Sequence, residues 1–156
     1  MTDPFLYAMQ PTDMSAVSSE TFDLQYYLEN LRNFITTAPT TWLPNQRIRQ
    51  FHLPGEKNII SCVFWNGLFL ISGTDIVRAL AFRFECFGRP VKVWKKFEEG
   101  IFSDLRTLKP GIGASMEEGR SDLLMFLHAN GAIRTVKKQK VFYWFSVDHN
   151  RLFLVS

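Results

Sequence analysis

The sequence predicts an α+β fold in which a small helical core is flanked by two β-hairpins. Three observations indicate this class. The pair Asn66-Gly67 separates two runs rich in β-branched and aromatic residues, which is the strongest short signal of a hairpin. Two later stretches repeat their apolar residues at helical spacing. Finally, residues 148–150 form a turn-like triplet after a strand-like run, which predicts the second hairpin.

The chain before this core divides into two segments by composition. Residues 1–20 mix Pro, Thr and Ser without periodicity, and we expect a flexible lead there. Residues 21–46 are expected to hold a helix and a linker, because Thr21 can cap a helix over 22–35 whose apolar residues recur at helical spacing. The main domain is then expected over residues 47–156.

The first hairpin leads directly into a helix. Its strands are expected at 59–65 and 68–71. Thr74 is the expected N-cap of the helix that follows, and Gly88-Arg89-Pro90 ends this helix. A second helical pattern covers 91–108, where Gly100 allows a kink or a split.

The C-terminal third is expected to contain a loop, a short helix and the second hairpin. The loop covers 110–119, and the short helix covers 123–128 with Asn130-Gly131 at its end. Strands at 141–147 and 151–155 then form the second hairpin.

Size and composition exclude several classes of protein. The 156 residues are the size of one domain. The composition, with 46% hydrophobic and 21% charged residues, is typical of a globular protein. No apolar run approaches the ~20 residues of a membrane span, and the N-terminus lacks the basic start of a secretory signal. Cys62 and Cys86 have no CxxC spacing, so we interpret both thiols as small core side chains.

Charge is distributed unevenly along the chain. Residues 1–46 carry one basic and five acidic side chains, whereas residues 47–156 carry 17 basic and 10 acidic ones. A basic domain fits a polyanionic partner, and nucleic acid is favoured over a membrane because no basic amphipathic stretch ends the chain. An ordinary basic surface is the alternative.

The sequence shows no pattern typical of catalysis or metal binding. His52, His128 and His149 lie far apart and have no ligand spacing. The Gly-containing stretch 110–115 lacks the Lys-Ser/Thr ending of a phosphate loop. We therefore expect no enzyme activity, no metal, no cofactor and no small-molecule substrate.

Two basic features indicate a nucleic-acid partner. The 91–108 helix has an apolar face opposite a basic one, as expected of a helix held by a core and lying in a DNA groove. The run 134–140 holds four basic residues and no acid before a strand, which suits phosphates. A solvated helix face and a solvated loop are the alternatives.

These features define the candidate DNA-contacting residues and their roles. The helix is expected to contact bases and phosphates through Lys92, Lys95, Lys96 and Arg106. The run is expected to contact mainly phosphates through Arg134, Lys137, Lys138 and Lys140, with Arg89 and Lys109 as secondary phosphate contacts.

Six strings carry a resemblance to a known family. They are ISGTDIVRALAFRF, FGRPVK, KKFEEGIFSDLR, LKPG, IRTVKKQKVFYWFSV and RLFL. In order and spacing they resemble the fungal STE DNA-binding domain of Ste-twelve-like transcription factors, over roughly residues 43–155. The resemblance implies a nuclear, sequence-specific double-stranded DNA-binding domain that reads TGAAACA-like pheromone-response elements. It also implies that the protein acts downstream of the MAP kinase cascades that control mating and filamentation.

The resemblance leaves two questions of architecture and partner open. The family has been likened to homeodomains, so a homeodomain-like all-α fold is the alternative to the winged-helix-like or KilA-like arrangement that the hairpins favour. The alternative function is a protein-interaction module whose aromatic surface binds another transcription factor or a repressor protein.

Overall fold

A computed structural model of the chain describes residues 19–55 and 58–156, with side chains described from residue 24 onward. Most of the expected flexible lead, residues 1–18, therefore lies outside the described residues. The first described helix, α3 (Ser19–Thr37), begins two residues before the predicted cap at Thr21 and ends two residues beyond the predicted helix. A short 3₁₀ turn, η1 (Ala38–Thr41), follows it.

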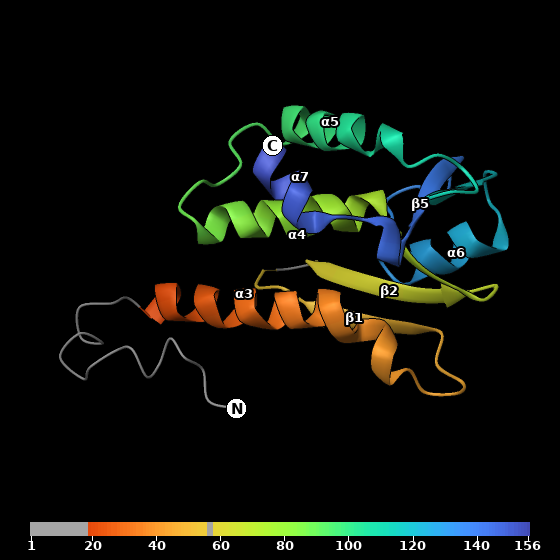
Figure 1. Cartoon of the computed structure of the whole chain (residues 1–156), viewed down its shortest axis with the longest axis horizontal. Coiled ribbons are helices and arrows are strands. Elements are labelled where there is room, and N and C mark those ends of the chain that lie inside the picture. The colour runs from red at the N-terminus through yellow and green to blue at the C-terminus, as the bar shows by residue number, and fades with distance from the viewer. Residues whose placement is uncertain (1–18, 56–57) are drawn as a thin grey trace.

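The centre of the fold is a five-stranded antiparallel sheet with the order β1-β2-β3-β5-β4. Its strands are β1 (Ile48–His52), β2 (Ile59–Trp65), β3 (Leu68–Ser72), β4 (Ala114–Glu117) and β5 (Gln139–Tyr143). Five α-helices accompany it within the described residues, so the mixed α+β class is confirmed and the all-α homeodomain-like alternative is not supported. In Figure 1, α4 lies between α3 and α5.

The first hairpin forms as predicted. Strands β2 and β3 pair antiparallel, with Trp65 opposite Leu68. Asn66 and Gly67 both have positive φ, 49° and 78°, which a two-residue type I′ turn requires. Local turn chemistry therefore accounts for the connection between these two strands.

Helix α4 (Gly73–Cys86) follows β3 without a loop. Its N-cap is Ser72, not the predicted Thr74: the Ser72 hydroxyl accepts a hydrogen bond from the backbone N–H of Asp75 at 3.1 Å. The same hydroxyl donates to the carbonyl of Ala132 at 2.6 Å. Gly88, at φ 72°, ends the helix, and the N–H of Arg89 reaches back to the carbonyl of Phe84.

Helix α5 (Trp94–Asp104) is shorter at its start than the predicted 91–108 stretch, and a 3₁₀ turn, η2 (Leu105–Thr107), continues it. Gly100 does not split α5, which is continuous from Trp94 to Asp104. Helix α6 (Asp122–Ala129) confirms the predicted short helix, with Ser121 as its N-cap and Gly131 at φ 76° after its end.

The predicted second hairpin is wrong. Residues 149–155 form helix α7 (His149–Val155), because Asp148 caps it by accepting from the N–H of Arg151. The residues of this helix that face the interior, His149, Leu152 and Phe153, have helical spacing. A strand there would also lack a place in the sheet, since β5 already pairs with β3 on one side and β4 on the other.

The last strand is also displaced from its predicted range of 141–147. It ends at Tyr143, and a 3₁₀ turn, η3 (Trp144–Ser146), carries the chain away from the sheet. Trp144 is buried, and its indole N–H donates to the carbonyl of Ile35 at 3.1 Å. Strand β4 lies inside the predicted loop 110–119, and β1 was not predicted.

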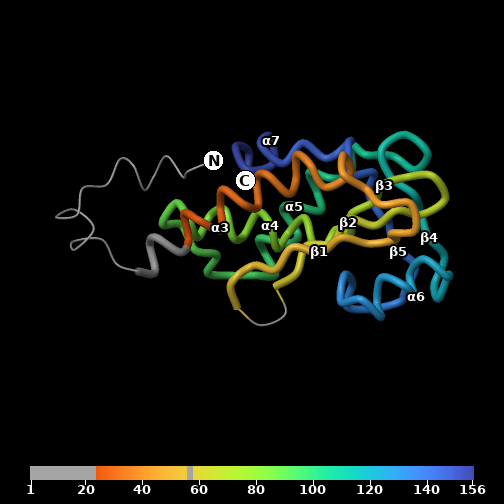
Figure 2. The backbone as a smooth tube through the Cα atoms, turned by 90° about the horizontal axis from the view of Figure 1, so that it is seen from below, coloured from red at the N-terminus to blue at the C-terminus, as the bar shows by residue number. Residues whose placement is uncertain are grey.

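The sheet separates two hydrophobic clusters. The larger joins Leu28 and Leu31 of α3 to β2, β3, α4 and α5. The smaller packs α6 through Leu124 and Leu127 against the other face of β2, β3 and β5, and Figure 2 shows α6 apart from α3 and α7. Helix α5 is therefore anchored on the α4 side of the larger cluster, which leaves its outer face exposed.

Candidate nucleic-acid interface

Helix α5 is amphipathic, as predicted. Phe97, Ile101 and Leu105 turn inward, and the Phe97 ring packs edge-on against Phe84 of α4 with 5.6 Å between ring centroids. Lys95 and Lys96 lie on the part of the helix surface that faces away from these residues, and both are exposed. The core thus fixes which side of α5 carries its basic residues.

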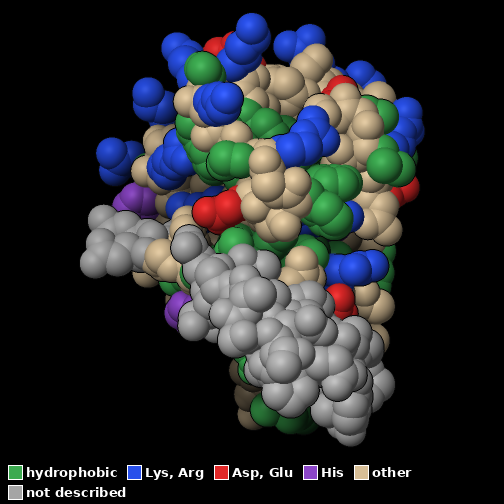
Figure 3. All heavy atoms as spheres, turned by 90° about the vertical axis from the view of Figure 1, so that its left-hand side faces the viewer, with side chains coloured by type: hydrophobic (Ala, Val, Ile, Leu, Met, Phe, Trp, Pro, Cys, Tyr) green, Lys and Arg blue, Asp and Glu red, His purple; other side chains and the backbone are tan. Residues whose placement is uncertain are grey.

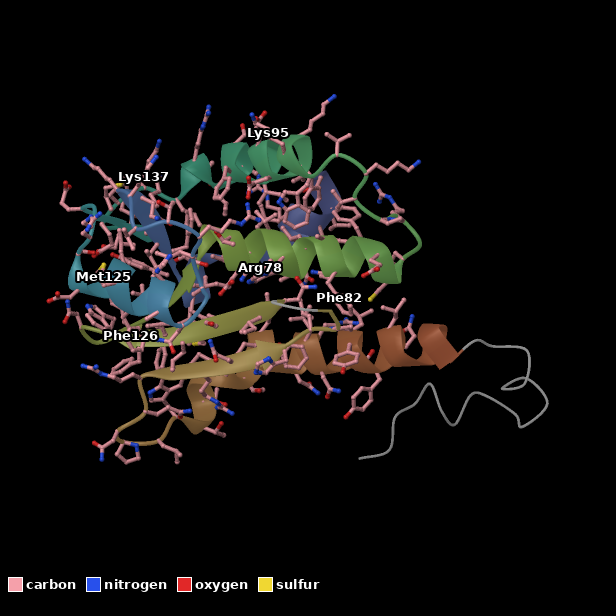
Figure 4. All side chains as sticks on the ribbon, turned by 180° about the vertical axis from the view of Figure 1, so that it is seen from behind. Arg78, Phe82, Lys95, Met125, Phe126 and Lys137 are labelled. Carbon is pink, nitrogen blue, oxygen red and sulfur yellow. The ribbon has the colours of Figure 1, made fainter. Side chains whose placement is uncertain are left out.

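Three lysines stand at the start of α5. Lys92 precedes the helix and Lys95 and Lys96 lie in its first turn; all three are exposed. None has a carboxylate within 4.0 Å among the described side chains. Figure 4 shows Lys95 pointing outward from α5, and Figure 3 shows Lys and Arg side chains gathered along the upper part of the molecule.

The basic segment 134–140, called the basic loop below although its last two residues begin β5, lies beside α5. Arg134 forms an ion pair with Glu98 of α5 at 3.6 Å, and the ammonium of Lys140 donates to the carbonyl of Leu108 at 3.0 Å. These two contacts tie the loop to the helix. In Figure 4, Lys137 and Lys95 lie along the same outer edge of the molecule.

The cations of this loop differ in how far they are neutralised. Lys138 lies 3.5 Å from the carboxylate of Glu118, and Lys140 is half-buried with its ammonium already bonded. Lys137 is exposed and has no carboxylate within 4.0 Å in the described part of the chain. Of the four predicted residues, Lys137 is therefore the best placed for an external anion.

The remaining candidates flank these two groups. Arg106 in η2 and Lys109 just after it are exposed, between α5 and the loop. Arg89 is exposed as well, but its guanidinium lies 4.7 Å from the centroid of the Phe84 ring, so it is held at the end of α4. We call the surface of Lys92, Lys95, Lys96, Arg106, Lys109 and Lys137 the α5 edge.

One cation near this edge escaped the sequence prediction. Arg120 is exposed at φ 58°, and its N–H donates to the carbonyl of Val136 at 2.8 Å, which places it beside the basic loop. Gly119 also lies against this loop, because a Cβ there would meet the backbone of Lys138 at 3.5 Å. No local signal in the sequence indicates this long-range contact.

A family model for STE-like transcription factors matches residues 32–156. The chain belongs to this family. Transcription factor MST12 of Pyricularia oryzae is 64% identical over 128 residues, which are 81% of this chain and 18% of that protein. Protein STE12 of Kluyveromyces lactis is 52% identical over 141 residues, or 90% of this chain and 21% of the relative.

Other fungal relatives match this STE-family domain over the same small share of their length. Transcription factor CPH1 of Candida albicans is 49% identical over 146 residues, which are 94% of this chain and 22% of that protein. The chain thus spans about a fifth of the length of these curated relatives. No solved structure matches the chain.

Membership in the STE family places the chain among transcription regulators rather than enzymes. Within the described residues, no three His, Cys, Asp or Glu side chains gather as a metal site would require. Burial raises the pKa of the Cys62 thiol to about 12 and that of Cys86 to about 11, and both cysteines are free. These values fit the predicted role of the thiols as core side chains. No described helix is long and apolar enough to cross a membrane.

Proposed function

We propose that this STE-family domain binds double-stranded DNA along the α5 edge. The observation that carries the proposal is the α5 edge itself, a set of exposed Lys and Arg side chains that have no carboxylate within 4.0 Å among the described residues. Such cations suit phosphates, because neutralising a phosphate releases condensed counterions from the duplex.

The division of roles follows from what each group of residues can do chemically. Arg106 offers a planar guanidinium that can read a guanine edge, and the lysines of α5 reach both bases and phosphates. Lys137 on the basic loop is a flexible point charge that suits phosphates. The family resemblance supports TGAAACA-like elements as targets, a nuclear location and a place below a MAP kinase cascade.

The test is selection of bound sequences from a random duplex library, followed by titration of the winning duplex at several salt concentrations. We expect enrichment of a TGAAACA-like motif and a steep fall in affinity with salt. Exchanging Lys95 and Lys96 for Gln should weaken binding. The matched control is Arg47→Gln, an exposed residue just before β1 at the sheet edge opposite β4 and β5, which should leave DNA affinity unchanged.

A second candidate function rests on a different surface. Trp42, Phe64, Phe69 and Phe145 form a chain of contacts with ring centroids 4.8 to 6.2 Å apart. Phe145, the last ring of this chain of contacts, is 73% exposed. Exposed aromatic side chains are enriched at protein interfaces, so this surface favours binding to another transcription factor or a repressor protein.

The two candidates differ in their response to salt. An aromatic interface depends weakly on salt, whereas the log of DNA affinity falls linearly with the log of salt concentration. Two results together would favour the interaction module. The library selection would yield no enriched motif, and the domain would capture a protein partner independently of salt. Phe145→Ser would abolish that capture.

A further inference from the structure

A polar cavity of about 460 Å³ lies away from the α5 edge, among α3, α4 and the start of α7. Figure 1 shows α7 in front of α4, and the residues that line the cavity include none of the residues of the α5 edge. The polar side chains that line the cavity are Arg32, Thr36, Arg83, Ser146, Asp148, His149 and Asn150.

Two unsatisfied polar atoms belong to residues of this cavity. Among the described side chains, the buried polar atoms without a hydrogen-bond partner are Nε of Arg83 and Nδ1 of His149. They come from separate elements, α4 and α7, and His149 is only 8% exposed. A buried polar atom without a partner costs free energy, so two such atoms on residues that line one cavity favour a ligand there that supplies the missing partners.

The charges around the cavity are mainly positive. The pKa of Arg83 is lowered, first by burial and then by the positive charge of Arg32. The carboxylate of Asp148 also lies here, but it accepts from the N–H of Arg151 at 3.0 Å as the cap of α7. Glu29 reaches Arg32 at 3.9 Å, and both side chains are more than half exposed, so that pair is weak.

His149 is placed to donate a hydrogen bond without carrying a charge. Burial and, to a smaller extent, the positive charge of Arg83 lower its pKa to about 4, while Asp148 acts in the opposite direction. The imidazole is therefore neutral near pH 7, and one tautomer carries a proton on Nδ1. The Arg83 guanidinium lies 4.4 Å from the centroid of the Phe153 ring, and Arg83 also lines the cavity.

We propose that Arg32, Arg83 and His149 bind the phosphate group of a phosphorylated side chain on a protein segment. Arginine matches a phosphate dianion because its N–H groups form two parallel charge-assisted hydrogen bonds. The cavity volume is in the range of sites that take organic ligands, so it has room for the side chain that bears the phosphate. Phe145 at its rim offers that carrier an apolar contact.

The proposal is independent of DNA binding and has its own readout. NMR spectra of the histidine ring protons are recorded while blocked phosphotyrosine, blocked phosphoserine, their unphosphorylated forms or inorganic phosphate are added to the chain. The His149 signals are assigned with His149→Gln. We expect a saturable shift of these signals with a phosphorylated probe, and titration of His149 at higher pH, because a nearby anion favours the charged imidazolium.

Matched variants localise the binding. Arg32→Gln and Arg83→Gln should each lower the affinity for the phosphorylated probe about ten-fold. Arg151→Gln removes an exposed guanidinium of α7 that does not line this cavity, and it should have no effect. If Arg83→Gln fails to fold, Arg32→Gln carries the test, because its side chain is 62% exposed.

Four results would overturn the proposal. The first is the absence of a saturable His149 shift with either phosphorylated probe. Equal affinity for inorganic phosphate would mean an adventitious ion only. An equal loss with Arg151→Gln would indicate general charge attraction. Finally, a stronger His149 shift with a short DNA duplex, abolished by Arg32→Gln, would assign the cavity to the DNA backbone.

Discussion

The start of α5 and the basic loop 134–140 look alike in charge but differ in their surroundings. By sequence the loop has the higher local positive charge, with four basic residues and no acid, whereas α5 contains the adjacent acids Glu98 and Glu99. In the structure, the start of α5 has more cations without a nearby carboxylate than the loop has. Lys92, Lys95 and Lys96 keep their charges exposed, while Glu98 and Glu118 come from other parts of the chain to meet Arg134 and Lys138.

The comparison shows why local charge counts mislead about binding surfaces. Ion pairs form between elements that the fold brings together, and the partners of this loop lie 20 and 36 residues away in the sequence. The same contacts give the loop a second role, because they hold it against α5. We therefore expect the α5 lysines to dominate binding and the loop to contribute one strong phosphate contact.

The largest expected effect comes from removing the α5 lysines together. Exchanging Lys92, Lys95 and Lys96 for Gln should lower DNA affinity about a hundred-fold at about 0.15 M salt and reduce the salt slope by about 3. Fluorescence anisotropy with a labelled duplex measures both quantities. A larger loss on exchanging Lys137 and Lys138 for Gln would reverse the ranking of the two regions.

Arg106 tests whether the edge reads sequence as well as charge. Arg106→Ala should cost about 1–3 kcal/mol on the preferred duplex and less on random DNA, because a guanidinium fork distinguishes guanine from the other bases. Competition between specific and random duplexes measures the ratio. A uniform loss on both duplexes would make Arg106 a phosphate contact instead.

Within the loop, the neighbouring lysines should differ. Lys137→Ala should weaken all duplexes about equally and reduce the salt slope by about 1. Lys138→Ala should do less, because Glu118 lies 3.5 Å from its ammonium and already neutralises part of its charge. Glu118→Gln should therefore raise DNA affinity. Equal losses for both lysines, with no gain from Glu118→Gln, would show that this ion pair does not persist in solution.

Lys140 should affect stability rather than binding. Lys140→Met keeps most of the apolar stem but removes the hydrogen bond to the carbonyl of Leu108, so the free energy of unfolding should fall by about 0.5–1.5 kcal/mol. Urea denaturation measures this change, and Lys137→Met is the control with no expected change. A loss of DNA affinity without a loss of stability would return Lys140 to the set of phosphate contacts.

The smallest effect is expected from metal removal. A chelator should change neither the melting temperature nor the DNA affinity, because neither the cysteines nor the histidines have ligand spacing. Thermal denaturation and anisotropy, each with and without chelator, check this. A large drop in either quantity would show that a metal contributes to one of the two regions.

Elements with strong local signals could be predicted from the sequence. The Asn66-Gly67 hairpin, helices α4, α5 and α6 and their ends at Gly88 and Gly131 all depend on residues close together in the chain. The amphipathic pattern of α5 also predicted its exposed lysines. Strands β1 and β4 could not be found in this way, because each is short and exists only through pairing with β2 or β5.

The sequence by itself determined the mixed fold class, the main helices, the first hairpin and the basic character of the main domain, because turns, caps and periodicity act within a few residues. Only the tertiary structure decided which cations remain unpaired and that residues 149–155 are helical. It also brought Arg32, Arg83 and His149 to one cavity. The reason is that sheet order, ion pairs and burial depend on residues distant in sequence, which local patterns do not specify.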